Sequence, residues 1–137
     1  PAYYNNTLIG SCDFSIQGGS VDAAFISITN FSIVPNNGNL TGEEYNIWAG
    51  DNVTKLGETI AQSEGYITST NANVNADGIY YTDMGEATYL SAFGDSGGPV
   101  YLTDSKKVIG IHKGSTAFTS IFVKVDNIAS KLNAHFN

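Results

Sequence analysis

The segment GDSGGPV, residues 94–100, constrains this chain more than any other part of its sequence. Its three glycines allow the backbone to turn tightly, so that the amide hydrogens of Gly94 and Ser96 can point at one spot beside the Ser96 hydroxyl. A serine hydroxyl is a weak nucleophile that needs a base and donors for a developing oxyanion. The segment therefore predicts a nucleophilic serine on a tight loop. The alternative interpretation is a glycine-rich surface turn without chemistry.

The same segment resembles the nucleophile loop of the trypsin/chymotrypsin-like serine proteases. Farther along, residues 107–115 (KVIGIHKGS) are similar to the strand that follows this loop in the compact bacterial streptogrisin and glutamyl endopeptidase type. The resemblance extends over nearly the whole chain, from residue 20 onward, and is most specific at residues 94–100. It implies an all-β, trypsin-like double β-barrel with the active site between the two barrels.

Upstream, the segment VDAAFISI at residues 21–28 is similar to the family's aspartate strand. The resemblance implies that Asp22 would hold a catalytic histidine in the right tautomer and stabilise its cation. It also implies that Ser96 is the nucleophile and that the Gly94 and Ser96 amides form the oxyanion hole. The alternative is that Asp22 only opens a strand.

The family's catalytic histidine has no counterpart in the sequence, because the two histidines, His112 and His135, both follow Ser96. Family members place this histidine well before the aspartate, where residues 1–21 contain none. We therefore expect the chain to lack the N-terminal part that carries the base. Three possibilities stay open: the part was removed, a second chain supplies the histidine, or catalysis was lost.

The resemblance divides the chain into two parts. Residues 1–34 are expected to be a remnant of the N-terminal barrel, and residues 35–137 the C-terminal barrel with the nucleophile, the specificity pocket and a C-terminal helix. A half-formed first barrel leaves strand edges and apolar side chains uncovered. The apolar side chains concerned are those of Phe14, Ile16, Phe25 and Ile28. We expect them to pair with a second copy of the chain or with the missing N-terminal segment.

The resemblance also indicates a specificity pocket that contains His112. In glutamyl endopeptidases a Gly-Ile-His strand offers an imidazole that hydrogen-bonds the acidic side chain of the substrate, and imidazole can donate without a fixed charge. Ser91, Thr88 and Ser115 are the other candidate pocket residues. We expect glutamate before the scissile bond, with glutamine next, because Leu90 stands where an acid would select lysine or arginine. The alternative is that His112 is a strand histidine satisfied by its neighbours.

Two further residues carry expectations. Asp95 corresponds to an acid that pairs with the new N-terminal ammonium in activated family members, but Pro1 lies far from it and the chain has no arginine. An unpaired buried carboxylate is costly, so without a partner the oxyanion loop would be collapsed or mobile. His135, near the end of the predicted C-terminal helix, is expected to interact with that helix terminus.

Short β runs separated by polar turns predict an all-β chain. Strands are expected at residues 25–28, 45–50, 58–68, 79–82, 99–102, 108–111 and 118–125, with polar turns at 34–39, 51–52 and 71–78. The tail changes period, and its apolar residues share one helix face. They are Val125, Ile128, Ala129, Leu132 and Phe136.

Composition restricts partners and location. A net charge of −7 and a pI near 4.4 argue against binding to nucleic acid or an anionic membrane. The single Cys12 excludes an intramolecular disulfide and gives no metal site, and no apolar run is long enough for a membrane span. Abundant Asn, Ser, Thr and Gly favour a secreted or cell-surface protein, with weak support from four N-x-S/T sequons. The sequons start at Asn5, Asn30, Asn39 and Asn52.

These observations predict a serine endopeptidase that cleaves polypeptides through an acyl-enzyme. We expect no metal or cofactor, since a triad and its backbone donors complete the chemistry. Two alternatives remain. One is a non-catalytic homologue that acts as a binding or surface domain, and the other is a self-processing protease whose substrate is its own precursor.

Overall fold

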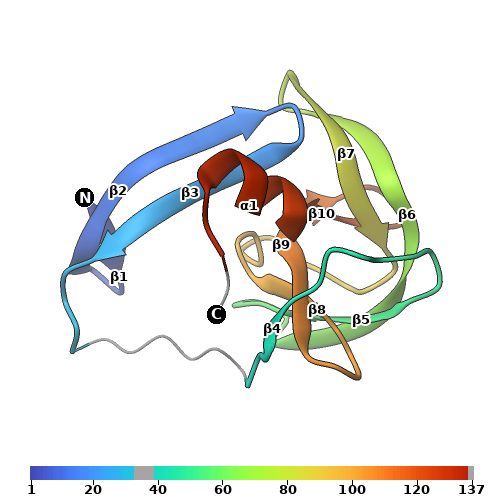
Figure 1. Cartoon of the computed structure of the whole chain (residues 1–137), viewed down its shortest axis with the longest axis horizontal. Helices are drawn as coiled ribbons and strands as arrows, with labels where there is room; N and C mark the ends of the chain where they lie inside the picture. The colour runs from blue at the N-terminus through green and yellow to red at the C-terminus, as the bar shows by residue number, and fades with distance from the viewer. Residues whose placement is uncertain (33–38, 136–137) are drawn as a thin grey trace.

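The computed structural model describes residues 1–32 and 39–135, and these residues form two β-sheets and one helix (Figure 1). The first sheet contains β1 (Ala2–Tyr4), β2 (Thr7–Gly18) and β3 (Val21–Ile28). The second contains β4 (Gly42–Glu43), β5 (Asn52–Leu56), β6 (Gln62–Ala76), β7 (Ile79–Ala87), β8 (Pro99–Leu102), β9 (Lys107–Ser115) and β10 (Ser120–Lys124). The helix, α1, spans Val125–Leu132. Phe136 and most of the connector predicted at 34–39 lie outside the described residues.

The second sheet closes on itself as a barrel. Its strand order is β10-β7-β6-β5-β8-β9-β4, and β10 pairs with β9 as well as with β7. The short strand β4 adds in parallel to the start of β9. A closed barrel leaves its six paired strands without free edges, which explains how one stretch of chain forms a stable unit.

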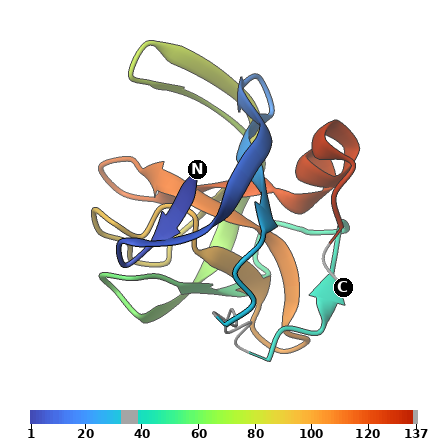
Figure 2. The ribbon, with the colours of Figure 1, turned by 90° about the vertical axis from the view of Figure 1, so that its left-hand side faces the viewer.

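The first sheet is open and antiparallel, in the order β1-β2-β3 (Figures 1 and 2). A parallel bridge between Gly19 and Tyr81 joins its β2–β3 turn to β7, and α1 contacts β3. Phe14 and Phe25 are exposed, as predicted, and stack on each other with ring centroids 5.4 Å apart. Ile16 is different, since it packs against the buried cluster around Tyr81.

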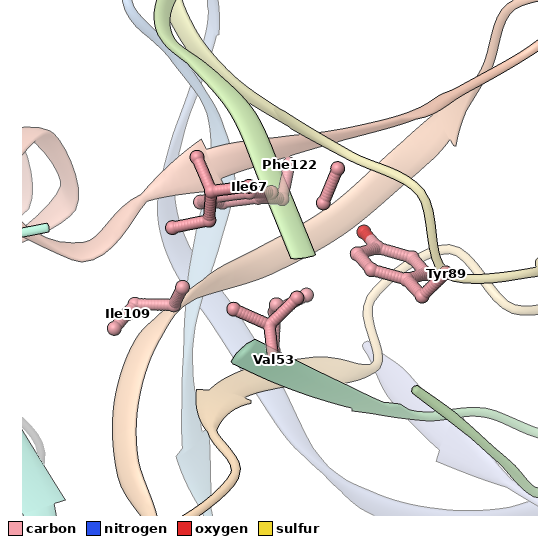
Figure 3. Close-up of a cluster of buried hydrophobic side chains, with 7 residues drawn as sticks. Val53, Ile67, Tyr89, Ile109 and Phe122 are labelled. Atoms are coloured by element: carbon pink, nitrogen blue, oxygen red, sulfur yellow. The ribbon is translucent and has the colours of Figure 1, made fainter. Parts of the chain in front are cut away.

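The barrel core is a cluster of side chains from the six barrel strands and from Tyr89, just after β7 (Figure 3). Its members are Val53, Ile67, Ala87, Tyr89, Val100, Ile109 and Phe122. Phe122 of β10 needs neighbours without side chains, because a Cβ on Gly85 would lie 2.1 Å from its ring and one on Gly110 2.5 Å. A second cluster, around Tyr81, Met84 and Val123, fills the space between the barrel and α1.

One strand prediction and one loop prediction are wrong. Residues 45–50 form no strand, and the Asp51 N–H instead closes a turn on the Trp48 carbonyl, so that the predicted turn residue Asn52 begins β5. Residues 71–76 are not a loop but the second half of β6. The reason is the two-residue turn Asp77-Gly78, whose φ angles of 52° and 79° fit a tight hairpin and allow both strands to continue up to it.

The remaining predictions agree better with the structure. β7 begins at residue 79 as predicted but is longer, the paired strands β8 and β9 are confirmed, and β10 lies within the predicted 118–125. The C-terminal helix is confirmed with its predicted face buried. Asn133, in the left-handed conformation, ends it. Among residues 1–32 and 39–135, no helix is long and apolar enough to cross a bilayer.

The core assignment predicts the effect of a pair of phenylalanine substitutions. Phe122 has no exposed surface, so Phe122→Ala should lower the free energy of unfolding by about 3–5 kcal/mol through lost burial and a cavity. Phe118 is 93% exposed, and Phe118→Ala should change it by less than about 0.5 kcal/mol. Urea unfolding followed by the fluorescence of the single tryptophan measures both. Equal losses would contradict the placement of Phe122.

Candidate active site

The loop at residues 94–100 has the backbone that its glycines predicted. Gly94 and Gly97 have φ angles of 103° and 92°, which favour glycine, and a Cβ on Gly98 would lie 1.9 Å from the Leu56 carbonyl oxygen. The Gly97 N–H donates to the His112 carbonyl, and the His112 N–H donates to the Gly98 carbonyl, both at 2.8 Å. The loop is therefore fastened to β9 on both sides of its turn.

The backbone amides beside Ser96 are available to a ligand. Within the described part of the chain, neither the Gly94 N–H nor the Ser96 N–H donates a hydrogen bond. Both residues line an open pocket together with Tyr4, Leu56 and Glu58. Two unpaired amide donors at the edge of a pocket, next to an exposed hydroxyl, are what an oxyanion site needs.

Asp95 is buried and fully hydrogen-bonded. Its carboxylate accepts the Lys55 ammonium at 2.7 Å and the N–H groups of Ala92, Thr59 and Ile60 at 2.8–3.0 Å. Burial alone would raise the pKa of Asp95, but the bond from Lys55 and the three amides outweigh it and hold the pKa well below its ordinary value. Asp95 therefore anchors the loop at residues 94–100 as a buried, ionised carboxylate.

Asp95 therefore has a cationic partner inside the protein. Lys55, on β5, supplies the cation that an arginine or an N-terminal ammonium was expected to supply, and it has no exposed surface. The condition for a collapsed oxyanion loop is absent. Lys55 was not among the residues predicted from the sequence, although a lysine within a strand segment such as Val53-Thr54-Lys55-Leu56 can indicate a buried cation that needs a counterion.

Asp22 lies on β3 and is paired with a lysine. Its Oδ2 accepts the Lys113 ammonium at 2.5 Å and, at 3.4 Å, the Tyr81 hydroxyl. The same ammonium lies 3.9 Å from the centroid of the Tyr81 ring, a cation–π contact. Burial lowers the pKa of Lys113, but the hydrogen bonds and charges of Asp22 and Tyr81 together outweigh this effect, and the pKa is raised overall.

Lys113 connects the two candidate catalytic residues. The Ser96 Oγ donates to its backbone carbonyl at 2.7 Å, while its side chain contacts Asp22 on the other sheet. Among the residues that the structure describes, no imidazole is hydrogen-bonded to Ser96 or to Asp22. Lys113 was not among the residues predicted from the sequence, where its one distinguishing feature is its position directly after His112.

His112 is buried in the barrel, with 3% of its surface exposed. Its Nδ1 lies 2.8 Å from the Tyr89 hydroxyl, and the two rings meet edge to face. Burial, and next the positive charge of Lys55, lower the pKa of His112 to about 4, while the charge of Asp95 acts in the opposite direction. The imidazole is therefore neutral at pH 7.

The candidate pocket residues are only partly brought together. The Ser91 Oγ lies 2.8 Å from the Ser120 Oγ, which also donates to the Tyr89 carbonyl, and Ser115 faces Ser120 in the β9–β10 register. Ser91 and Ser115 thus share a neighbour close to the Tyr89–His112 pair. Thr88 does not join this group, since its hydroxyl accepts the backbone N–H of Tyr66 on β6 at 3.0 Å.

His135 does not interact with the terminus of α1 as expected. Its Nδ1 lies 3.0 Å from the Glu43 Oε1 and 3.4 Å from the Tyr45 hydroxyl, so it ties the chain after α1 to β4. The expectation is wrong because the left-handed residue Asn133 turns the chain away from the helix axis before His135 is reached.

The buried pair predicts a large effect of Lys55→Met. The substitution leaves the Asp95 carboxylate buried without its cation, which should lower the free energy of unfolding by about 3–5 kcal/mol in urea at pH 7. Lys131→Met is the control, because Lys131 is exposed on α1 and should contribute less than about 0.5 kcal/mol. A Lys55→Met protein as stable as the native one would refute this role.

The lowered pKa of His112 predicts a dependence of stability on pH. Between its ordinary value of 6.5 and about 4, the unfolded chain binds more protons than the folded chain. The contribution of neutral His112 is therefore fully present above pH 6.5 and is lost as the pH falls toward 4, to a total of about 3 kcal/mol. Asp95 acts likewise below its ordinary pKa of 3.8.

Unfolding of the native chain and of His112→Gln, compared from pH 7 down to pH 4.5, checks this expectation. The difference in unfolding free energy between the two proteins should shrink as the pH falls. A difference that stays constant over this range would mean that the histidine titrates alike in the folded and unfolded chains.

Comparison with known proteins identifies the family. The family model described as Trypsin matches residues 26–132. Glutamyl endopeptidase 2 of Streptomyces griseus is 39% identical over 72 residues, which are 52% of this chain and 37% of that protein. The match thus spans little more than a third of the relative's length.

Solved structures agree in fold. The chymotrypsin of Cellulomonas bogoriensis has a TM-score of 0.74 at 21% identity, over 90% of this chain and 72% of that one. A glutamic acid-specific serine protease described as using a histidine triad in substrate binding has a TM-score of 0.80 at 22% identity, over 94% and 74%. The matched family model shows that the chain belongs to the trypsin family of serine proteases, and the solved structures show that it has the all-β fold of that family.

Proposed function

We propose that this chain carries the nucleophile and the orienting acid of a serine endopeptidase. Membership of the trypsin family supports a peptidase. The observation that carries the residue assignment is a pair of backbone N–H groups, those of Gly94 and Ser96, that donate no hydrogen bond among the described residues. They lie beside the Ser96 hydroxyl on a loop anchored by Asp95. Such preorganised donors stabilise an oxyanion without rearrangement during the reaction.

The proposed reaction follows from these positions. The Ser96 Oγ attacks the peptide carbonyl carbon while a base takes its proton, and the carbonyl oxygen becomes an oxyanion held by the two amides. The proton then passes to the departing amine, which leaves an acyl-enzyme. Water hydrolyses the ester by the same steps and restores Ser96. Asp22 would orient the base and stabilise its cation.

The base would be a histidine from outside this sequence, either from a further N-terminal segment or from a second chain. The imidazoles of the two histidines contact Tyr89 and Glu43, and neither is hydrogen-bonded to Ser96 among the described residues. Asp22 supports the proposal, because its side chain is 31% exposed and its Oδ1 accepts no hydrogen bond among the described residues. That oxygen is free to accept an imidazole N–H while Oδ2 keeps Lys113.

The first sheet supports docking of such a segment. Exposed aromatic and aliphatic side chains cover β1, β2 and the end of β3, and the outer edges of β1 and β3 have no neighbouring strand among the described residues. The most exposed are Tyr3, Tyr4, Leu8, Phe14, Phe25 and Ile26. Either the histidine-bearing segment or a second copy of the chain would cover them. A secreted or cell-surface location, suggested by composition, completes the proposal.

The proposed substrate preference is glutamate before the scissile bond, with glutamine next. The similarity to a glutamyl endopeptidase supports it, as does the neutral, buried imidazole of His112. Its partner Tyr89 accepts at its carbonyl from Ser120, the residue that neighbours Ser91 and Ser115. Thr88 is the weakest of the proposed pocket residues, because its hydroxyl is engaged by the β6 backbone. Leu90 offers no negative charge for lysine or arginine.

A second candidate function is a non-catalytic binding domain. The observation in its favour is the Lys113 ammonium, which contacts Asp22 in the absence of any imidazole there among the described residues. In that case the loop at 94–100 would only stabilise the barrel, through its bonds to β9 and to Lys55.

Labelling of Ser96 by a fluorophosphonate tests the proposal. Without a base, the chain alone should react several powers of ten more slowly than trypsin, since a missing triad member costs about that much. Added imidazole should accelerate labelling of the native chain by supplying the base. Asp22→Asn should lose most of that acceleration, and Ser96→Ala should not be labelled.

Two results would decide against parts of the proposal. Rapid labelling of the chain alone would mean that one of its own residues acts as the base. Labelling that stays absent at every imidazole concentration, in a chain whose folding is verified by circular dichroism, would favour the non-catalytic domain. The exposed serine Ser105, changed to alanine, is the control for labelling elsewhere.

A further inference from the structure

The ring of His112 has one fixed partner and one open nitrogen. Its Nδ1 lies 2.8 Å from the Tyr89 hydroxyl. Its Nε2 has no hydrogen-bond partner within residues 1–32 and 39–135, yet every fully buried side-chain nitrogen and oxygen of those residues has one. The Nε2 therefore keeps solvent-accessible surface, although the residue as a whole is almost completely buried.

The Tyr89 hydroxyl has a single partner in the same part of the chain, the His112 Nδ1. A neutral imidazole carries its proton on one nitrogen and accepts at the other, whereas a phenol offers one donor. If Nδ1 carried the proton, it would donate to the Tyr89 oxygen, and the buried phenolic hydrogen would lose its acceptor. An unsatisfied buried donor costs about 1–3 kcal/mol, so the arrangement in which Tyr89 donates is preferred.

Tyr89 is held rigidly in the position that this bond requires. Its ring belongs to the barrel core and is 1% exposed, and Figure 3 shows it beside the other side chains of the cluster. Its carbonyl accepts the Ser120 hydroxyl, and a Cβ on Gly65 would lie 2.4 Å from its backbone nitrogen. Burial also raises the pKa of the phenol far above its ordinary value, so the hydroxyl keeps its proton.

We propose that Tyr89 is a positioning residue for substrate selection, whose hydroxyl donates to the His112 Nδ1 and thereby places the imidazole proton on Nε2. There the N–H serves as an uncharged donor to the carboxylate or carboxamide oxygen of the residue before the scissile bond. The inference rests on the proposed function and adds to it the residue that sets the direction of the hydrogen bond. With the proton on Nδ1 instead, Nε2 would accept, and it would repel the oxygens of glutamate and glutamine.

The tautomer is measurable without any catalysis. In the ¹⁵N-labelled chain at pH 7, the imidazole shifts of His112 should show a protonated Nε2 and an unprotonated Nδ1. Tyr89→Phe should convert this signature to a mixture or to the other tautomer. Tyr101→Phe is the matched control, because Tyr101 is equally buried but its hydroxyl has no partner among the described residues, and it should leave the signature unchanged. A native His112 protonated on Nδ1, or an unchanged Tyr89→Phe spectrum, would overturn the proposal.

The effect on selection is measured in the chain assembled with its histidine-bearing segment. Tyr89→Phe should lower kcat/KM for substrates with glutamate or glutamine before the scissile bond by roughly tenfold and leave leucine substrates nearly unchanged. An equal loss for all three would show that Tyr89 is only structural. If no substrate is cleaved, the proposed peptidase function fails, while the ¹⁵N measurement still decides the role of Tyr89.

Discussion

The buried ion pair between Lys55 and Asp95 is the interaction on which the candidate site depends. It joins a strand in the barrel wall to the residue immediately before Ser96, and both side chains are fully buried. Removing either charge alone would leave the other unpaired in a low-dielectric interior, so the two positions are coupled. Three backbone N–H groups also donate to the Asp95 carboxylate. These bonds and the ion pair together fix the position of the loop that carries Asp95.

Strand β9 places two neighbouring residues of the site, His112 and Lys113, in different surroundings. Successive residues on a strand point to opposite faces, so His112 faces the barrel interior and Tyr89, while Lys113 faces Asp22 on the first sheet. The backbone of the same two residues holds the nucleophile loop, through Gly97 and through the Ser96 hydroxyl. One strand thus connects the proposed selection of substrate to the proposed nucleophile.

The proposed triad draws on two sheets that are joined by few contacts. Asp22 belongs to the open sheet and Ser96 to the closed barrel, and Lys113 is the residue that touches both. The ammonium of Lys113 balances the charge of Asp22 and leaves one carboxylate oxygen free, so the acid is stable without an imidazole beside it. This balance explains how a chain without a base at this position can keep the acid in place.

Local patterns in the sequence determined much of this protein. The glycines of residues 94–100, the hairpin of β8 and β9, and the buried face of α1 could all be predicted, because each depends on residues close together in the chain. Tertiary structure decided the partners. Lys55 lies 40 residues from Asp95 and Lys113 lies 91 from Asp22, and only closure of the barrel and its contact with the first sheet bring these charges together. No local pattern encodes such pairs, since their distance is set by how the whole chain packs.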